Sequence, residues 1–97
     1  TGSSGSANGT GTSASFYKPY RITTDGTNLY VGDTFNHLIR QIVISTGVVT
    51  TLAGTGSSGT ANGTGTSASF NNPIGITTDG INLYVVDYGY SRIRQIE

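Results

Sequence analysis

The chain has 97 residues with 5 basic and 5 acidic side chains, so its formal net charge at pH 7 is zero. Charged residues make up 10% of the chain, well below the roughly 25% of an average globular protein. A surface this poor in charge argues against binding to nucleic acids or to anionic membranes. The sequence has no cysteine, which excludes disulfides, thiolate chemistry and cysteine-bound zinc.

No run of apolar residues approaches the roughly 20 that cross a membrane as a helix. No signal peptide is visible, but the sequence begins at Thr1, so one could have been removed. The composition favours a secreted or cell-surface protein without deciding the location. Glycine, serine, threonine and asparagine dominate the polar positions, which favours turns and β-strands over helices.

The chain opens on a segment rich in Gly, Ser and Thr, residues 1–16, which predicts a loop. Two apolar runs follow, PYRITTD and NLYVGD, and the Asp25-Gly26 pair between them is a strong signal of a β-hairpin. The run HLIRQIVI predicts a third strand, and a turn at Ser45-Thr46-Gly47 leads into a fourth, VVTTLA. The four predicted antiparallel strands are therefore 19–25, 28–33, 37–44 and 48–53.

These elements recur along the chain with a period of 54 residues. Residues 55–97 repeat residues 1–43 with 30 identities in 43 positions, which divides the chain into repeats 1–54 and 55–97. Periods of this length are typical of solenoids, propellers and arrays of small units. The second repeat is 11 residues short, at the place of residues 44–54, so its fourth strand is missing. That unit remains three-stranded, takes a strand from another chain, or continues in residues beyond this sequence.

Residues 54–59, GTGSSG, spell the Gly-x-Gly-x-x-Gly of a dinucleotide-binding loop, and Asp79 follows Gly59 by 20 residues. Such a loop must open a helix whose N-terminus receives the pyrophosphate. The residues that follow are rich in Gly, Thr and Asn and include Pro73, and these end helices or prevent them. Asp79 is itself a turn residue with a counterpart at Asp25. We therefore interpret the string as a loop between two units and expect no nucleotide cofactor.

The second repeat carries the residues of a known pattern. Residues 70–97, FNNPIGITTDGINLYVVDYGYSRIRQIE, closely resemble an NHL repeat, and residues 46–56 resemble the outer strand of that family. The matching residues are Pro73, Gly75, Ile76, Asp79, Asn82, Leu83, Tyr84, Val85, Asp87, Arg92, Ile93, Arg94 and Ile96. The first repeat matches less well, because Arg21 replaces the glycine and Leu38 replaces the first arginine. The resemblance implies an all-β fold of β-propeller blades, usually six, each of four antiparallel strands with the first strand lining the central channel.

A propeller blade packs between two neighbours, so both faces of its inner strands have to be apolar. The second strand meets this requirement with Leu29 and Val31 on one face and Tyr30 on the other. Propellers have roughly 4 to 8 blades, so two blades cannot close a ring and the chain is expected to self-associate. A homotrimer with six blades is the favoured assembly, and a tetramer with eight is the alternative.

The 13 differences between the copies cluster at the start of the first strand and the end of the second. In antiparallel strands these segments share one face of the ring, while the Asp-Gly turns lie on the other. Variable loops on a fixed scaffold usually carry binding specificity, although drift at exposed positions is the simpler explanation. The candidate residues for a protein or small-molecule ligand are Tyr17, Lys18, Tyr20, Arg21, Phe35, His37, Asn72, Tyr88, Tyr90 and Arg92.

The sequence offers no catalytic or metal-binding constellation. His37 is the only histidine, and because no nucleophile or orienting carboxylate can be named for it, a turn-stabilising role is favoured. Asp25, Asp33, Asp79 and Asp87 stand at strand ends, where we expect them to cap loop N–H groups. A calcium site would need several converging oxygen ligands. We therefore expect no catalytic residue, no metal and no cofactor.

The favoured function is a non-enzymatic, self-assembling propeller that acts as a structural scaffold or binding module. Two alternatives remain. Some six-bladed propellers of related shape are lyases or lactonases, which would need inward-facing acids and histidines as metal ligands. Some animal NHL proteins bind RNA through a basic face, for which Lys18, Arg21 and Arg92 are a thin supply. The sequence does not decide whether the chain is a natural fragment, a designed or reconstructed protein, or part of a longer array.

Two local features carry expectations of their own. In a trimer, three Arg21 side chains could converge on the channel axis and bind an anion, or each could stack beside Tyr17 and Tyr20. Asn8-Gly9-Thr10 and its copy at 62–64 fit the glycosylation sequon, but they also spell Asn-Gly turns, and the turn is favoured.

Overall fold

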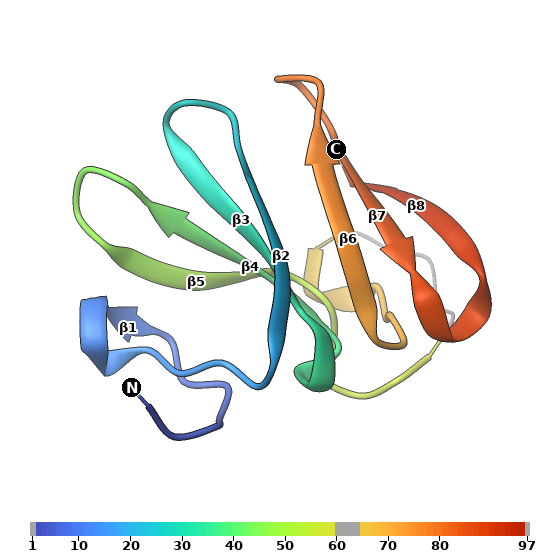
Figure 1. Cartoon of the computed structure of the whole chain (residues 1–97), viewed down its shortest axis with the longest axis horizontal. Helices are drawn as coiled ribbons and strands as arrows, with labels where there is room; N and C mark the ends of the chain where they lie inside the picture. The colour runs from blue at the N-terminus through green and yellow to red at the C-terminus, as the bar shows by residue number, and fades with distance from the viewer. Residues whose placement is uncertain (1, 60–64, 97) are drawn as a thin grey trace.

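The computed structural model describes residues 2–59 and 65–96, without the side chain of Tyr90. Two antiparallel β-sheets stand side by side like the blades of a fan, with β2 and β6 next to each other at the centre (Figure 1). In spatial order the first sheet consists of β1 (Gly9–Thr10), β5 (Val48–Ala53), β4 (Leu38–Val43), β3 (Asn28–Asp33) and β2 (Pro19–Thr24). The second sheet consists of β6 (Pro73–Thr78), β7 (Leu83–Asp87) and β8 (Arg92–Ile96). Short 3-10 turns flank the strands at η1 (Gly11–Ser13), η2 (Thr34–Asn36), η3 (Gly65–Ser67) and η4 (Tyr88–Tyr90).

The all-β fold and the antiparallel blade strands predicted from the sequence are confirmed. The Asp-Gly hairpins form as expected, with Gly26 at φ 93° and Gly80 at φ 94°, a region that glycine enters without strain. Asp25 Oδ1 accepts hydrogen bonds from the backbone N–H groups of Thr27 (3.0 Å) and Asn28 (2.9 Å), which closes the first turn. The second sheet has three strands, in agreement with its missing fourth strand.

The leading segment is more than the loop that the sequence predicts. Its β1 pairs antiparallel with β5, placing Gly9 opposite Val49 and Thr10 opposite Val48. The predicted turn at Asn8-Gly9 is wrong, because Gly9 starts this strand; the copy, Asn62-Gly63, lies outside the described residues. The physical reason is the outer edge of β5, whose backbone N–H and C=O groups need a partner. Gly9 and Thr10 supply backbone groups that pair with this edge, although neither side chain is apolar.

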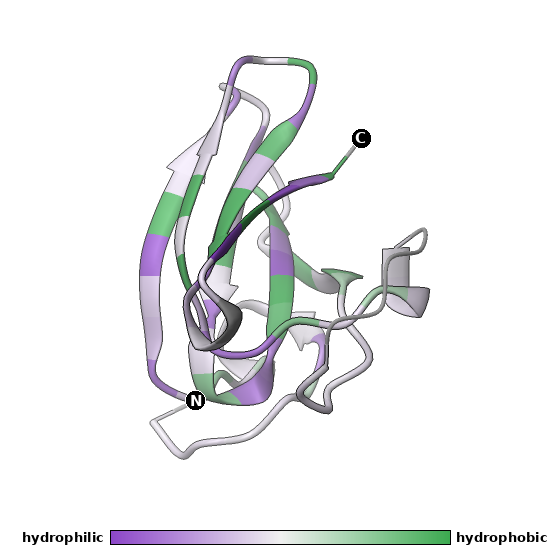
Figure 2. Ribbon diagram, turned by 90° about the vertical axis from the view of Figure 1, so that its right-hand side faces the viewer, coloured by the Kyte–Doolittle hydropathy of each residue, from purple (hydrophilic) through white to green (hydrophobic). Residues whose placement is uncertain are grey.

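The hydrophobic core lies between the two sheets. Ile39 and Ala53 of the first sheet, both fully buried, pack against Phe70 and Val85 of the second repeat, together with Ala68. Hydrophobic and hydrophilic residues alternate along the strands (Figure 2), as expected when successive side chains point to opposite faces. Among the described residues, no helix is long and apolar enough to cross a membrane.

Candidate binding face

The segments that differ between the copies gather at one end of the sheets. The β2–β3 and β6–β7 hairpin turns lie at the top of the view, and η2 and η4 lie at the lower end with the segments that lead into β2 and β6 (Figure 1). We call this lower end the binding face. The arrangement agrees with the two faces expected from strand direction.

An aromatic cluster forms on the binding face of the first blade. The rings of Tyr17 and Phe35 meet edge to face with centroids 5.2 Å apart, and the backbone N–H of Phe35 donates to the carbonyl of Tyr17 at 3.1 Å. Lys18 Nζ lies 5.9 Å from the Phe35 ring centroid. Both rings remain exposed. The structure therefore brings three of the candidate ligand residues together.

Tyr20 and Arg21 form a separate pair on the innermost strand. The Arg21 guanidinium carbon lies 4.9 Å from the Tyr20 ring centroid, and both side chains are exposed. This stack is the alternative that the sequence offered to an axial anion site, although Tyr17 is not part of it. Opposite Arg21 on β3 stands Gly32, whereas in the second blade Gly75 stands opposite Val86. The large residue thus changes strand between the copies.

His37 contacts the neighbouring blade. It adopts a left-handed backbone conformation with φ 56°, and its Nδ1 accepts a hydrogen bond of 3.0 Å from the backbone N–H of Asn72. Next to it, Thr34 Oγ1 donates to the carbonyl of Pro73 at 2.7 Å, in a buried position. These bonds join η2 of the first blade to the start of β6. His37 and Asn72 therefore help to fix the angle between the blades, a role beyond stabilisation of a local turn.

The remaining candidate residues lie apart from the aromatic cluster. Tyr88, in η4, is 64% exposed, and Arg92 begins β8. This turn is on the side of the second sheet away from the first (Figure 1). The Tyr90 side chain lies outside the described part of the structure. Within one chain, then, the nine candidates whose side chains the structure describes form separate groups and no single site.

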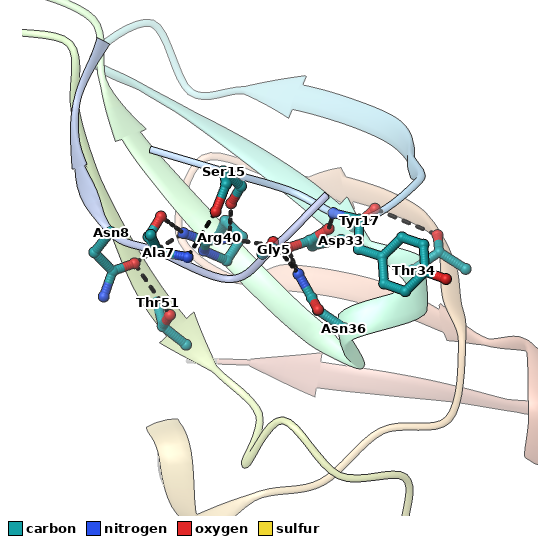
Figure 3. Close-up of polar contacts among 11 residues, drawn as sticks. Gly5, Ala7, Asn8, Ser15, Tyr17, Asp33, Thr34, Asn36, Arg40 and Thr51 are labelled. Carbon is teal, nitrogen blue, oxygen red and sulfur yellow. Dashed lines mark hydrogen bonds and ion pairs between the residues drawn. The ribbon is translucent and has the colours of Figure 1, made fainter. Parts of the chain in front are cut away.

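A buried ion pair in each blade is the main feature that sequence reasoning missed. Arg40 Nη1 lies 2.9 Å from Asp33 Oδ2, and both side chains are fully buried. Arg40 also donates to the carbonyls of Ser15 (2.8 Å) and Ala7 (2.9 Å) and to Asn8 Oδ1 (2.9 Å), as Figure 3 shows. The pair therefore ties the leading segment to the first sheet.

Asp33, the last residue of β3, also bonds to η2 and to the segment that leads into β2. Its Oδ1 accepts a hydrogen bond from the backbone N–H of Tyr17 at 2.8 Å, and its Oδ2 accepts one from Asn36 Nδ2 at 2.8 Å (Figure 3). The expectation that Asp33 caps a loop N–H group is confirmed, but burial and the ion pair were not anticipated.

The second blade repeats this design. Arg94 Nη1 lies 3.1 Å from Asp87 Oδ2, and Asp87 Oδ1 accepts the backbone N–H of Asn71 at 2.7 Å. The Arg40 and Arg94 guanidinium carbons lie over the rings of the copied phenylalanines, 4.9 Å from Phe16 and 5.0 Å from Phe70. An aspartate and an arginine kept in both copies, the arginine within an apolar strand, were the available sequence signal.

Comparison with known proteins identifies the repeats. NHL repeat-containing protein 2 is 36% identical in Bos taurus and 35% identical in Homo sapiens, over 98 residues that cover 96% of this chain. The chain belongs to the NHL-repeat family. It spans 14% of the length of these relatives, and no family model matches it.

Solved structures support the propeller fold of the NHL pair. An auxiliary nutrient binding protein from Bacteroides thetaiotaomicron superposes with a TM-score of 0.88 at 30% identity, covering 99% of this chain and 26% of that one. One from Bacteroides ovatus gives 0.86 at 29% identity, covering 98% and 26%. The two sheets are therefore propeller blades, and an NHL module of this kind is a binding or scaffold unit.

The described residues of the two NHL repeats were expected to hold neither a metal nor a nucleotide, and their arrangement gives no support for either site. Within residues 2–59 and 65–96 no group of three or more His, Cys, Asp or Glu side chains converges on one point. The string GTGSSG folds back onto the next blade, where the backbone N–H of Gly59 donates to the carbonyl of Phe70 at 3.1 Å. Its next described helical element is the three-residue η3, too short for the dipole of a nucleotide-binding helix.

The pKa values of the two hairpin aspartates, Asp25 and Asp79, are lowered from the ordinary value. Hydrogen bonds from the backbone N–H groups of Asn28 and Thr27 lower the pKa of Asp25, and those of Asn82 and Ile81 lower the pKa of Asp79. In the folded state both carboxyls thus hold their protons less tightly than in the unfolded chain. Their stabilising contribution is complete above the unfolded pKa of about 3.9 and is lost as pH falls through the lower folded value.

We therefore expect stability to fall on acidification below about pH 4. In the double variant Asp25→Asn with Asp79→Asn, this loss should become shallower, because the amide oxygens still accept the turn bonds without titrating. Urea midpoints from pH 7 down to pH 3 provide the measurement. An unchanged acid slope in the double variant would assign the acid response to other groups.

Proposed function

We propose that the chain is a non-enzymatic scaffold and binding module whose NHL blades close into a ring with those of further copies. The observation that carries the proposal is a pair of open sheet faces that match the closed interface inside the chain. Ile39 of the first blade is 0% exposed against the second, whereas its copy Ile93 is 71% exposed. Ile22 is 57% exposed, whereas its copy Ile76 packs against the core between the blades.

The interface within the chain is a template for the one between chains. We call the side of a blade that faces the preceding blade its upstream face, and the other side its downstream face. The upstream face of the first blade holds an apolar hollow of about 330 Å³. Its lining includes Phe16, Tyr20, Ile22, Val31 and Ile42. Four of these positions, all except Tyr20, have copies among the second-blade residues that pack at the blade interface, Phe70, Ile76, Val85 and Ile96.

Contact of one downstream face with the next upstream face is head-to-tail, which gives a closed ring when the rotation fits. Three copies supply six blades, the number usual in the NHL family, and four copies supply eight. We favour the homotrimer. Burying Ile93, Ile22 and their neighbours supplies the driving force, since about 25 cal/mol is gained for each Å² of apolar surface removed from water.

The binding role belongs to the end of the ring where the copies differ. The two structural neighbours from Bacteroides are auxiliary nutrient binding proteins. In this chain, the exposed rings of Tyr17 and Phe35 with Lys18 suit a small molecule or a protein ligand. RNA binding is disfavoured because two of the five basic residues, Arg40 and Arg94, are engaged in buried ion pairs and cannot contribute to a basic surface. Against catalysis, Asp33 and Asp87 are engaged in the same pairs.

The test of the ring is the mass in solution. Native mass spectrometry and light scattering should give three copies of the 10.0 kDa chain. Ile22→Glu should reduce the mass to that of one chain, because assembly would bury an unpaired charge. Ile81→Glu is the matched control: Ile81 is 85% exposed in a hairpin turn, so assembly should persist. A wild-type protein that stays at 10.0 kDa at every concentration would overturn the proposal.

A further inference from the structure

The interface between chains cannot be an exact copy of the interface within the chain. Inside the chain, a Cβ placed on Gly32 would lie 3.1 Å from the carbonyl oxygen of Pro73, so the blades touch backbone to backbone there. The copy of Gly32 on the open downstream face is Val86, which is 38% exposed. Docked identically, Val86 would drive its side chain into the carbonyl of Pro19 on the next copy. The two blades must stand further apart at this point.

Two other substitutions near this contact also enlarge the side chain on the open faces, whereas Gly89 in place of Phe35 and Ser91 in place of His37 reduce it. Thr34, which donates to the Pro73 carbonyl, is replaced by Tyr88, and Ile74 of the upstream face is replaced by Tyr20. His37 and Asn72, which bond to each other, are replaced by Ser91 and Lys18. Tyr88 is 64% exposed and Tyr20 is 63% exposed in the single chain. These larger side chains fill a wider gap.

We infer that the ring has two kinds of seam, and that the seam between chains is the wider one, filled by Val86 and Tyr88 of one copy against Lys18, Pro19 and Tyr20 of the next. The inference rests on the proposed ring and deepens it, since it names the contact residues of the partner, a second copy of this chain. Alternate close and wide seams give the ring threefold instead of sixfold symmetry.

The wide seam also unites candidate ligand residues that one chain keeps apart. Lys18, Tyr20 and Arg21 are at the upstream end of the chain, and Tyr88 is at the downstream end. Head-to-tail contact brings the two sets together on the binding face. A ring of three copies therefore has three such composite surfaces, each lined by residues of two chains and absent from the isolated chain.

Cross-linking tests the contact directly, because the chain has no native cysteine. Two variants, Ser91→Cys and Lys18→Cys, are mixed and treated with a short bismaleimide. At the close seam within the chain, the corresponding residues are His37 and Asn72, and the backbone N–H of Asn72 donates to His37 Nδ1 at 3.0 Å. The mixture should therefore give a cross-linked dimer, while each variant alone gives none, because a head-to-tail seam never places two equal positions together. Ile81→Cys mixed with Lys18→Cys is the matched control and should stay uncross-linked.

The outcomes separate this inference from the ring itself. If the wild-type mass is oligomeric but the mixture does not cross-link, or Lys18→Cys cross-links alone, the chains assemble through another surface. The contact residues proposed here are then wrong. If the wild-type mass is that of one chain, both proposals fail.

The width of the seam is tested with Val86→Gly, which restores the residue of the close seam. In a wide seam the loss of the valine contacts should weaken assembly about tenfold, measured as the dissociation constant by dilution in light scattering. A tighter assembly would mean that the valine had been a steric obstacle, and would overturn the wide seam.

Discussion

Replacement of Asp33 by alanine is expected to lower the free energy of unfolding by about 3–5 kcal/mol, the usual cost of leaving one member of a buried ion pair without its partner. The side chains of Arg40 and Asp33 are both fully buried, and Arg40 Nη1 lies 2.9 Å from Asp33 Oδ2. Loss of the carboxylate also removes the acceptor for the backbone N–H of Tyr17 and for Asn36 Nδ2. The measurement is urea unfolding at one fixed protein concentration, so that assembly contributes equally to both proteins.

The second repeat supplies a matched control for this prediction. Asp87→Ala removes the same carboxylate, but Arg94 keeps 9% exposure where Arg40 has none, so water relieves part of its charge. We expect a smaller loss than for Asp33→Ala. Replacing both Asp33 and Arg40 by leucine and methionine should cost less than Asp33→Ala, because no buried charge is left alone. A cost below about 1 kcal/mol for Asp33→Ala would show that Arg40 finds other partners.

Phe70→Ala is expected to destabilise the chain by about 3–5 kcal/mol, because it opens a cavity in the core between the blades. Phe70 is 1% exposed and lies beneath the Arg94 guanidinium. The copied residue Phe16 lies on the open upstream face and is only partly buried in the single chain. Phe16→Ala should therefore cost clearly less than Phe70→Ala wherever the chain is monomeric.

Assembly changes the comparison between the two phenylalanines. In a closed ring Phe16 is covered by the next copy, so the costs of Phe16→Ala and Phe70→Ala should approach each other as protein concentration rises. Urea midpoints at low and high concentration, read together with the mass, provide the measurement. If the difference in urea midpoint between Phe16→Ala and Phe70→Ala stays the same in the assembled protein, the upstream face is not covered.

The hairpins could be predicted because their cause is local. Gly26 and Gly80 take positive φ angles, and Asp25 binds N–H groups two and three residues further along, so the turn is specified within four residues. The apolar alternation of the strands is equally local. The repeat, with 30 identities in 43 positions, then extended each prediction to the second blade.

Features that join distant parts of the chain could not be read in this way. The burial of Arg40 was not predicted from the sequence, because it depends on Asp33, 7 residues away, and Ser15, 25 residues away, which meet it in space. β1 is a two-residue strand within a Gly- and Ser-rich segment, and it forms because it pairs with the edge of β5. The candidate binding residues shared a variable face, but only the packing angle of the blades separates Tyr17 and Phe35 from Tyr88.

The sequence by itself therefore determined the repeat, its strands, its hairpins and the NHL resemblance, since each depends on neighbours within a few residues or on direct comparison of the copies. Only the tertiary structure decided that Gly32 touches Pro73, that His37 bonds to Asn72, and that Ile22 and Ile93 remain open while Ile76 and Ile39 are covered. The physical reason is that burial and blade spacing depend on which surfaces meet, and identical strings experience different surroundings in the first and second blade.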